Sequence, residues 1–302
     1  MEGDFTLVIK DYCIRATAAN GAIRIFVAST QGLVERARQI HELSPVSSAA
    51  LGRLLSAASI MGLMMGNDDD LLTASIKGSG PLGGLLACAD GQGRVRGYAH
   101  NPACNLPLRA DGKLDVSGAI GAGRLTIIRD MGLKEPYVGN IELISGEIAE
   151  DIAYYYAKSE QTPSVVALGV LVDKDYSIRR AGGYFIQLLP GADDSVIDRL
   201  EARLAATPPV TAMLDGGLSP EDILKRLASD FDYKITAEHP IGFLCNCSRE
   251  RVEDALVLVD KNELEDMIKK DKQAEISCHF CNTNYHFNES QLRGLAPSAQ
   301  GR

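Results

Sequence analysis

Two closely spaced cysteine pairs near the C-terminus constrain the fold of this chain most. Cys245 and Cys247 stand in "FLCNCSRE", and Cys278 and Cys281 stand in "ISCHFCNTNY". Residues i and i+2 of an extended segment face the same side, so the first pair can present both sulfurs to one point. The CxxC spacing of the second pair is typical of zinc knuckles. Together the four thiols predict a structural site for one Zn(II) per chain.

Other candidate ligands and catalytic groups are weaker. His279 and His286 lie beside the second pair, but four thiolates already complete a zinc site. The same closed ligand set argues against a hydrolytic zinc enzyme or a zinc deaminase, because these keep a position open for water. Cys13, Cys88 and Cys104 have no paired spacing, and we interpret them as bystanders. No catalytic residue is predicted.

Composition limits the class of protein. The chain has 302 residues, 45% of them hydrophobic, which is enough for one large core and a smaller module. Its formal net charge of -9 argues against wrapping nucleic acid, and the segment from residue 241 on is no basic exception, with eight Lys or Arg against ten Asp or Glu. We expect no export signal in "MEGDFTLVIKDYC" and no membrane span, since the longest nearly uncharged stretch, 54–66, is too short. We therefore expect a cytosolic protein. In the reducing cytosol, paired cysteines are usually metal ligands or redox-active thiols.

The pattern of residues 1–190 predicts an α+β core domain, in which helices pack on a mixed β-sheet. A turn at Asn20 and Gly21 is expected to join two of its strands. The predicted elements are strands at 5–9, 14–19 and 22–30, a helix over 33–41, a buried helix over 46–65, an antiparallel meander over 71–99, a strand running into a helix over 139–163, and a closing strand at 182–190.

Two motifs in this domain imitate functional sites. "GSGPLGG" (78–84) satisfies the GxGxxG dinucleotide pattern, but it contains Pro81 and leads into the strand-like "LLACAD" instead of a helix. We therefore predict a turn. Three acids within 147–151 resemble a general acid and base, but we interpret them as acids that complement a helix N-terminus.

Residues 191–240 predict a helical linker with two short amphipathic helices. Ser219 and Pro220 mark the start of the second helix, and the breaker-rich "TPPVTAMLDGG" (207–217) predicts a hinge between the two. Packing on the core domain is the ordinary expectation, and docking that depends on the state of the protein stays open. The apolar faces are candidates for a gate or a client-binding surface: Val196, Ile197, Leu200, Ile223, Leu224, Leu227 and Phe231.

Residues 241–302 predict a small zinc-binding module. A helix over 251–259 would turn Val252, Leu256 and Val259 inward, and a second helix would start with a capping box of Asp260 and Glu263. A strand, a turn and a strand around 276–287 would then close the thiolate site.

The chain resembles a known family over nearly its whole length. The resemblance lies in "SPVSSAALGRLLSAASIMG", "GSGPLGG", "GRVRGYAHNP", "GEIAEDIAYYYAKSEQTP", "AGGYFIQLLPGA" and above all in "FLCNCSRERVEDAL" followed by "CHFCNTNYHF". These motifs are similar to those of the thirty-three-kilodalton heat shock proteins, the redox-regulated holdase chaperones of bacteria. A CxC pair followed about thirty residues later by a CxxC pair is the hallmark of that family.

The resemblance implies a function that is not enzymatic. The zinc ligands would be the four cysteines named above, and the reduced, zinc-bound protein would be inactive. Oxidation would link Cys245 with Cys247 and Cys278 with Cys281, release zinc, and unfold the C-terminal module and the linker. The opened protein, usually a homodimer, would hold unfolding client proteins without ATP during oxidative stress, with no nucleic acid or membrane partner.

Two alternatives remain at this stage. A zinc-ribbon nucleic-acid binder would need a basic or aromatic face, which the acidic C-terminal segment does not provide. A thiol-disulfide oxidoreductase that uses "CHFC" would favour an exposed cysteine of low pKa in a βαβ setting, whereas the second cysteine pair indicates metal binding.

Overall fold

The chain forms two compact units, divided between Leu244 and Cys245, which we call the first unit and the C-terminal unit. The computed structural model describes residues 11–259 and 265–295. The strand predicted at 5–9 and the capping box predicted at Asp260 and Glu263 lie outside the described residues. The chain combines helices with largely antiparallel sheets, which confirms the predicted α+β class.

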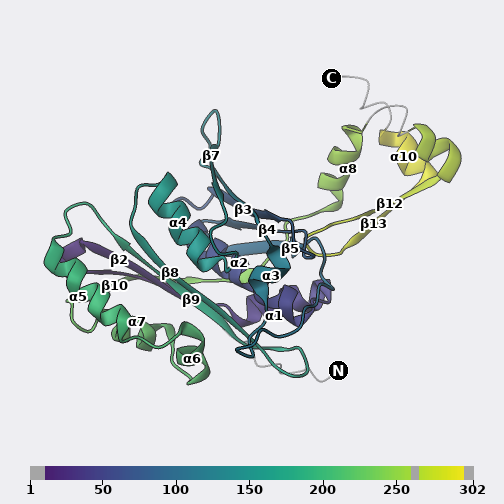
Figure 1. The fold of residues 1–302 in the computed structure, drawn as a ribbon. Coiled ribbons are helices and arrows are strands. Elements are labelled where there is room, and N and C mark those ends of the chain that lie inside the picture. The colour runs from purple at the N-terminus through teal and green to yellow at the C-terminus, as the bar shows by residue number, and fades with distance from the viewer. Residues whose placement is uncertain (1–10, 260–264, 296–302) are drawn as a thin grey trace, which may run out of the picture. The chain divides into compact units, whose positions relative to one another are not determined.

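Two sheets form the frame of the first unit (Figure 1). Sheet A is antiparallel, with the order β10-β1-β2-β9-β8, and sheet B has the order β11-β5-β4-β3-β6-β7. The 3-10 turn η1 (Ala19–Gly21), with Asn20 at φ 54°, joins β1 to β2 where the hairpin turn is predicted. The strands are β1 (Tyr12–Ala18), β2 (Ile23–Ser29), β3 (Leu71–Gly78), β4 (Gly84–Asp90), β5 (Arg94–Ala99), β6 (Gly123–Asp130), β7 (Tyr137–Glu142), β8 (Ser164–Val172), β9 (Ile178–Leu188), β10 (Tyr233–Pro240) and β11 (Gly242–Phe243).

The helix α2 (Pro45–Leu63) forms the centre of the first unit, in contact with strands of both sheets. It begins at the N-cap Ser44, whose side chain accepts a hydrogen bond from the Ser47 N–H, and seventeen of its nineteen residues are buried. The buried helix predicted over 46–65 is thus confirmed. Its length and apolarity are sufficient to cross a membrane, but 94% of its apolar window is buried inside the protein, as in the core helix of a globular domain. The helices α1 (Gln31–His41), α3 (Val116–Ile120) and α4 (Ala149–Ser159) surround the same core.

Both imitation motifs have structural roles, as predicted. The Gly80 N–H donates to the Ile120 carbonyl at 2.8 Å, and a Cβ at Gly80 would lie only 2.4 Å from the Ala119 carbonyl oxygen. The glycines of "GSGPLGG" therefore let this turn approach the end of α3. The Asp151 carboxylate is fully buried and accepts hydrogen bonds from the Ile144, Ser145 and Ile148 N–H groups at 2.8–3.0 Å. It holds the turn before α4.

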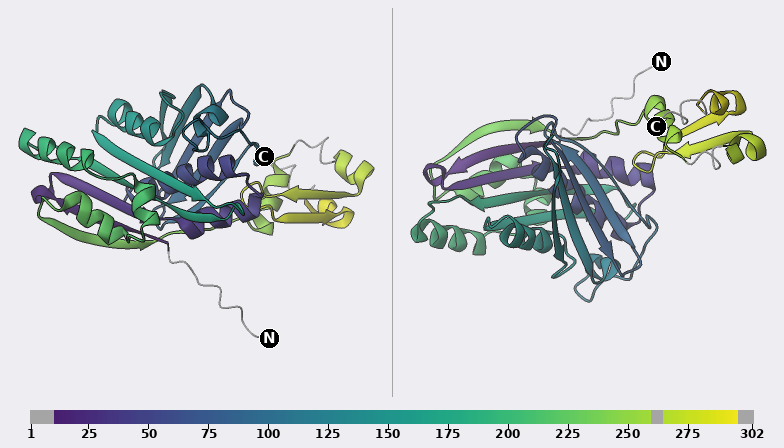
Figure 2. Two further views of the ribbon diagram at one scale, coloured as in Figure 1. Left: turned by 60° about the horizontal axis from the view of Figure 1, so that its bottom comes forward. Right: turned by 90° about the horizontal axis from the view of Figure 1, so that it is seen from above.

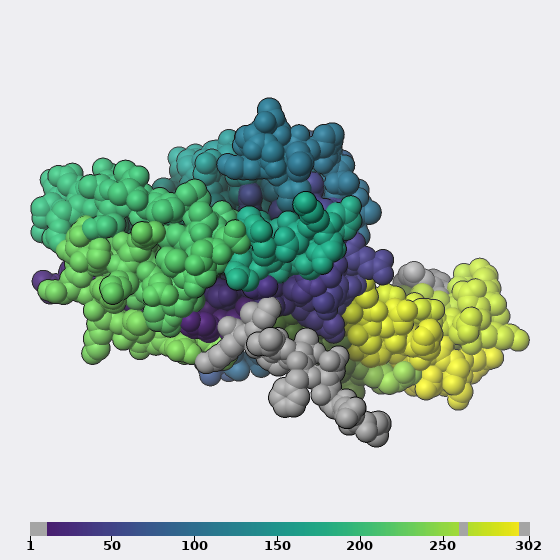
Figure 3. Space-filling view, turned by 90° about the horizontal axis from the view of Figure 1, so that it is seen from below, coloured from purple at the N-terminus to yellow at the C-terminus, as the bar shows by residue number. Residues whose placement is uncertain are grey.

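The helical part of the segment 191–240 covers the face of sheet A opposite to α2 (Figure 2), and the rest of the segment forms the edge strand β10 of that sheet. The helices α5 (Asp194–Ala205), α6 (Val210–Asp215) and α7 (Pro220–Ala228) form a continuous surface, drawn in green in Figure 3. The hinge predicted over 207–217 contains α6, because Pro209 and Gly216 cap a short helix instead of interrupting one. The strand β10 was not predicted. It is an edge strand in which Tyr233, Ile235 and Ala237 alternate with polar residues, but its side chains are largely exposed and this short pattern was overlooked.

The C-terminal unit is small. It consists of α8 (Arg249–Val257), the π-helical turn η2 (Met267–Asp271), β12 (Gln273–Ser277), β13 (Asn284–Asn288) and α10 (Glu289–Leu295). The predicted inward helix face and the strand-turn-strand are confirmed, while α10 was not predicted. Its core of fully buried side chains comprises Leu256, Ile268, Phe287 and Leu292. So few buried apolar side chains rarely stabilise a module of this size without a staple.

Candidate metal centre

The first cysteine pair lies between β11 and α8. The Ser248 side chain caps α8 by accepting a hydrogen bond from the Arg251 N–H at 3.3 Å. The Arg249 guanidinium lies over the Phe287 ring, 4.2 Å from its centroid, and donates to the His286 carbonyl at 3.1 Å. These contacts fix the start of α8 against β13, so the segment that carries Cys245 and Cys247 is anchored at its C-terminal end.

The second pair occupies the turn between β12 and β13. The Cys278 N–H donates to the Thr283 carbonyl at 3.0 Å, and the Asn282 N–H donates to the Cys278 carbonyl at 2.8 Å. Asn282 adopts a left-handed conformation, φ 55°, which asparagine tolerates better than most residues. This tight turn places the sulfurs of Cys278 and Cys281 on the same side as those of the first pair.

The four sulfurs form one cluster, with every Sγ within 4.8 Å of the others. The Sγ atoms of Cys245 and Cys278 are 3.7 Å apart, and those of Cys247 and Cys281 are 3.3 Å apart. Tetrahedral zinc with Zn–S bonds of about 2.3 Å requires S···S distances of about 3.8 Å. The side chains are half-buried, and the donor set is all sulfur, which suits Zn(II).

Neighbouring groups act on these sulfurs. The Tyr285 hydroxyl donates to the Cys247 Sγ at 3.2 Å, and the Thr283 Oγ1 lies 3.2 Å from the Cys281 Sγ. Burial raises the pKa of Cys245. For Cys281, burial also raises the pKa, but the hydrogen bonds from Thr283 and from Cys247 outweigh it and lower the pKa to about 7. Hydrogen bonds to the sulfurs favour the thiolate, which is the form that binds metal and reacts with oxidants.

The remaining candidate ligands lie elsewhere. His279 and His286 are exposed, and His286 Nδ1 lies 3.7 Å from a Glu275 carboxylate oxygen. The cluster contains neither imidazole. Among the other cysteines, Cys13 and Cys104 are buried in the main core of the first unit, and the Cys88 Sγ lies 3.6 Å from the Thr73 hydroxyl on β3.

Known proteins that resemble this chain share both its sequence and its fold. The family model described as Hsp33 protein matches residues 11–288. The chain belongs to the Hsp33 family. It is 51% identical to a 33 kDa chaperonin of Lachnoclostridium phytofermentans, over 95% of this chain and 98% of that one, and 50% identical to one of Clostridioides difficile, over 94% and 98%. A solved 33 kDa chaperonin structure from Thermotoga maritima is 36% identical and superposes with a TM-score of 0.87, covering 95% of this chain and 98% of that one.

The predicted gate residues of this Hsp33 family chain belong to its linker segment, and most of them are buried between the linker helices and sheet A. Leu200, Ile223, Leu224, Leu227 and Phe231 are buried against sheet A. Val196 is partly buried against the same cluster, and Ile197 is half-buried. The faces predicted from helical spacing therefore pack on β1, β2 and β9, whose side chains on this face include Ile14, Ile25 and Ile186.

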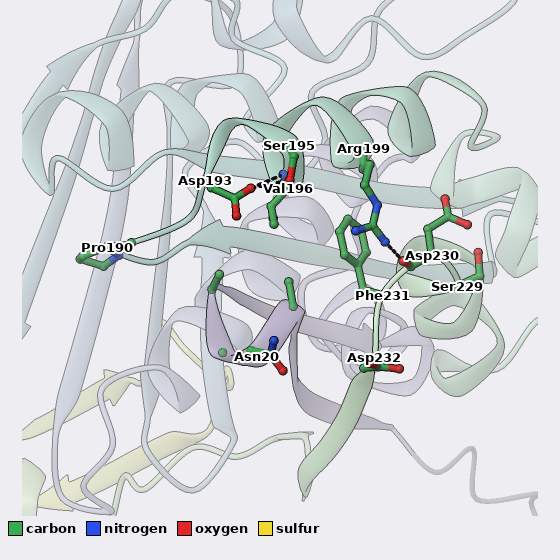
Figure 4. A pocket seen from close by; sticks show the side chains of 14 residues that line it. Asn20, Pro190, Asp193, Ser195, Val196, Arg199, Ser229, Asp230, Phe231 and Asp232 are labelled. Carbon is green, nitrogen blue, oxygen red and sulfur yellow. Dashed lines mark hydrogen bonds between the residues drawn. The ribbon is translucent and has the colours of Figure 1, made fainter.

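A polar clasp joins α5 to the end of α7 (Figure 4). Arg199 lies over the Phe231 ring, 4.5 Å from its centroid, and donates to the Asp230 carbonyl. The Arg203 Nε donates to the Asp230 carboxylate at 2.8 Å. Sequence reasoning missed this clasp, because the partners lie about thirty positions apart. It also missed Tyr285 and Thr283, although their position next to "CHFC" was a usable signal.

Proposed function

We propose that this Hsp33 family chain is a redox-regulated, ATP-independent holdase that acts by binding unfolding proteins, not by catalysis. The observation that carries the proposal is the convergence of four half-buried sulfurs in a unit whose described residues include only four fully buried apolar side chains. Loss of the metal site would therefore unfold the C-terminal unit. The family membership and the names of the relatives support the chaperone part of the proposal.

Cys245, Cys247, Cys278 and Cys281 would hold one Zn(II). Bound zinc supplies a cross-link between thiolates, which in small peptides corresponds to roughly 10 to 16 kcal/mol of apparent binding free energy at neutral pH. The protein's own contribution is to bring the CxC segment next to the β12–β13 turn, with Tyr285 donating to one of the sulfurs. The reduced unit is then folded and the chaperone is inactive.

Oxidation would join Cys245 to Cys247 and Cys278 to Cys281. Each disulfide forms as two thiolates lose two electrons, and hydrogen peroxide, which accepts these electrons and two protons from the solvent, is reduced to two molecules of water. In the folded unit, the Sγ–Sγ contacts of 3.7 and 3.3 Å join cysteines of different pairs. Once the unit unfolds, however, a short loop closes at a lower entropic cost than one of more than thirty residues, which favours bonds within each pair. Peptide mapping of the oxidised chain tests this pairing, and bonds between the pairs would overturn it.

Loss of the C-terminal unit would release the linker. Residues 191–240 end in β10, which pairs with β1, and the chain then passes through the two-residue strand β11, which pairs with β5, before it reaches the first cysteine pair. With the C-terminal unit unfolded, these edge pairings would have to hold the end of the linker without support from the chain beyond Leu244. Short amphipathic helices such as α5 and α7 have little stability without tertiary packing. Their undocking would expose apolar side chains of the helices and of sheet A, the kind of surface that binds unfolding chains and favours a homodimer.

The alternatives have less support. The CxxC pair lies in a β-hairpin and not in a βαβ unit, which disfavours a thiol-disulfide oxidoreductase. The net negative charge disfavours a nucleic-acid binder. We propose a cytosolic protein without nucleic-acid or membrane partners.

The function is tested by light scattering of a heat-unfolding client protein. The reduced, zinc-loaded chain should leave aggregation unchanged, and the chain treated with peroxide under mild unfolding stress should suppress it. Reduction should reverse the effect. Equal activity of the reduced and oxidised chains would overturn the redox gate, and inactivity of both would overturn the holdase.

A further inference from the structure

A small cavity in the first unit, remote in sequence from the cysteines, carries an unbalanced positive charge. Its volume is about 120 Å³, and it lies where the ends of α2 and α4 meet strands of both sheets. The charged side chains that line it are Arg24 of β2, Arg129 of β6 and Glu160, which follows α4. One of the two guanidinium charges is therefore not compensated within the cavity.

Glu160 forms an ion pair with Arg129 and not with Arg24. The Arg129 Nη2 donates to both Glu160 carboxylate oxygens at 2.8 Å, and the Tyr155 hydroxyl donates to the same carboxylate at 2.6 Å. Arg24 donates only to a neutral acceptor, the Gln187 Oε1, at 2.6 Å. Burial lowers the pKa of Arg24. Its guanidinium also lies over the Phe26 ring, 5.6 Å from the centroid. A half-buried cation whose described partners are an amide and an aromatic ring, with no opposite charge, attracts an anion.

The spare hydrogen-bonding groups of the cavity are donors. Gln187 is buried, accepts a hydrogen bond from Arg24 and donates one to the Ser164 hydroxyl. The Tyr156 hydroxyl donates to the Met64 sulfur, and the Tyr155 hydroxyl donates to the Glu160 carboxylate. Both arginines keep N–H groups without an acceptor, and the Nε of each is buried without a partner among the described residues. Gln187 also fixes the Arg24 guanidinium in place, so the cationic group is preorganised.

The rest of the wall is apolar. Met61, Met64 and Met65 from the end of α2 line it with Leu72 and the rings of the two tyrosines. Since a water molecule occupies about 30 Å³ in the liquid, the cavity has room for roughly four non-hydrogen atoms or slightly more. A charged end beside a soft apolar wall suits an amphipathic anion better than a fully hydrated inorganic ion.

We propose that this cavity binds a small organic carboxylate of two or three carbons, with the carboxylate on Arg24 and the alkyl group against the methionines. A carboxylate matches the planar fork of a guanidinium, and it neutralises the remaining charge. The site is independent of the proposed redox function, since no cysteine lines it.

Methionine methyl groups provide a direct readout. The chain has seven methionines, three of which line the cavity, while Met131 on the β6–β7 turn and Met213 in α6 lie outside it and serve as internal references. The full-length, reduced, zinc-loaded chain labelled with 13C at the methionine methyls is titrated with acetate or propionate at constant ionic strength. The resonances of Met61, Met64 and Met65 should shift and saturate, while those of Met131 and Met213 stay in place.

Two variants assign the effect. Arg24→Gln should weaken the affinity by about tenfold or more, because it removes the charge-assisted hydrogen bonds. Arg124→Gln, on the same strand as Arg129, removes a guanidinium that pairs with Glu142 at the surface, and it should keep the affinity within about twofold. Unchanged Met131 and Met213 resonances show that each variant is folded, and Arg24→Lys replaces Arg24→Gln if they change. Absence of saturable shifts, equal shifts in the Arg24 variant, or shifts with phosphate but not with carboxylates would overturn the proposal.

Discussion

Single residues show how burial and hydrogen bonding set the chemistry of this chain. Asp11, just before β1, is buried, and its carboxylate accepts a hydrogen bond from the Leu33 N–H in the first turn of α1 at 2.5 Å. It supplies the cap that the N-cap residue Thr30 does not provide. Burial raises the pKa of Asp11 to about 6, although the backbone N–H groups of residues 31–33 act in the opposite direction.

This carboxyl makes the first unit more stable as the pH falls. Its folded pKa, about 6, lies above the ordinary 3.8, so the folded state keeps a proton that the unfolded state has lost. Its contribution is therefore greatest below about pH 4 and is lost as the pH rises through 6. Asp11→Asn keeps an acceptor for the Leu33 N–H but cannot titrate. Denaturant unfolding should show the variant gaining roughly 2 kcal/mol on the parent from pH 4.5 to 7.5. A difference that does not change with pH would contradict this.

The sulfur cluster gives a second prediction for single residues. Cys278→Ser or Cys281→Ser should weaken zinc binding severely, because serine is a poor ligand for zinc and each sulfur contacts a sulfur of the other pair. Zinc content per chain, measured after purification under reducing conditions, gives the result. Cys88→Ser on β4 is the matched control and should retain one zinc. A Cys278 or Cys281 variant with full zinc affinity would remove that residue from the ligand set.

At the level of elements, the docking of α5, α6 and α7 on sheet A decides whether apolar surface is exposed. Leu227 is fully buried on the inner face of α7, and a carboxylate there would be desolvated without a partner. Leu227→Glu should therefore undock α7 and switch on part of the chaperone activity without oxidant. Light scattering of a heated client under reducing conditions, with zinc retained, measures this activity.

The control for that variant lies on the opposite face of the same helix. Lys225 is exposed, and Lys225→Gln changes the net charge by the same amount as Leu227→Glu. It should leave the reduced chain inactive. If Leu227→Glu is equally inactive although its linker is shown to be unfolded, undocking is not the gate.

Elements whose signals are local were predictable, and elements that depend on distant partners were not. The apolar runs of α2 and the helical spacing of apolar residues in α5 and α7 were sufficient to predict these helices. The spacing of apolar residues along a helix shows whether the helix is buried on one side or on all sides. The edge strand β10 exists through its pairing with β1, more than two hundred residues earlier, and its own side chains are mostly exposed. The four cysteines could be found because metal sites use short, conspicuous spacings, whereas the cavity around Arg24 and Arg129 joins strands that no local pattern connects.

For the whole molecule, the two units should differ in how they depend on zinc. The first unit has a large core shared by both sheets and α2, while the described residues of the C-terminal unit include four fully buried apolar side chains. Chelation of zinc under reducing conditions should therefore unfold the C-terminal unit and release the linker, and it should leave β1 to β9 and α2 folded. Limited proteolysis should then cut beyond residue 190 while β1 to β9 stay protected, and added zinc should restore protection. Simultaneous cleavage throughout the first unit would contradict this division of stability.

The central claim is that oxidation unfolds the C-terminal unit and thereby releases α5, α6 and α7 from sheet A. Amide hydrogen exchange, read by mass spectrometry on the reduced zinc-loaded chain and on the oxidised chain, tests it directly. The account predicts that oxidation removes protection from residues 245–295 and from α5 to α7, while α2 and the central strands of sheet B keep theirs. Full protection of α5 to α7 in oxidised protein that suppresses client aggregation would contradict it.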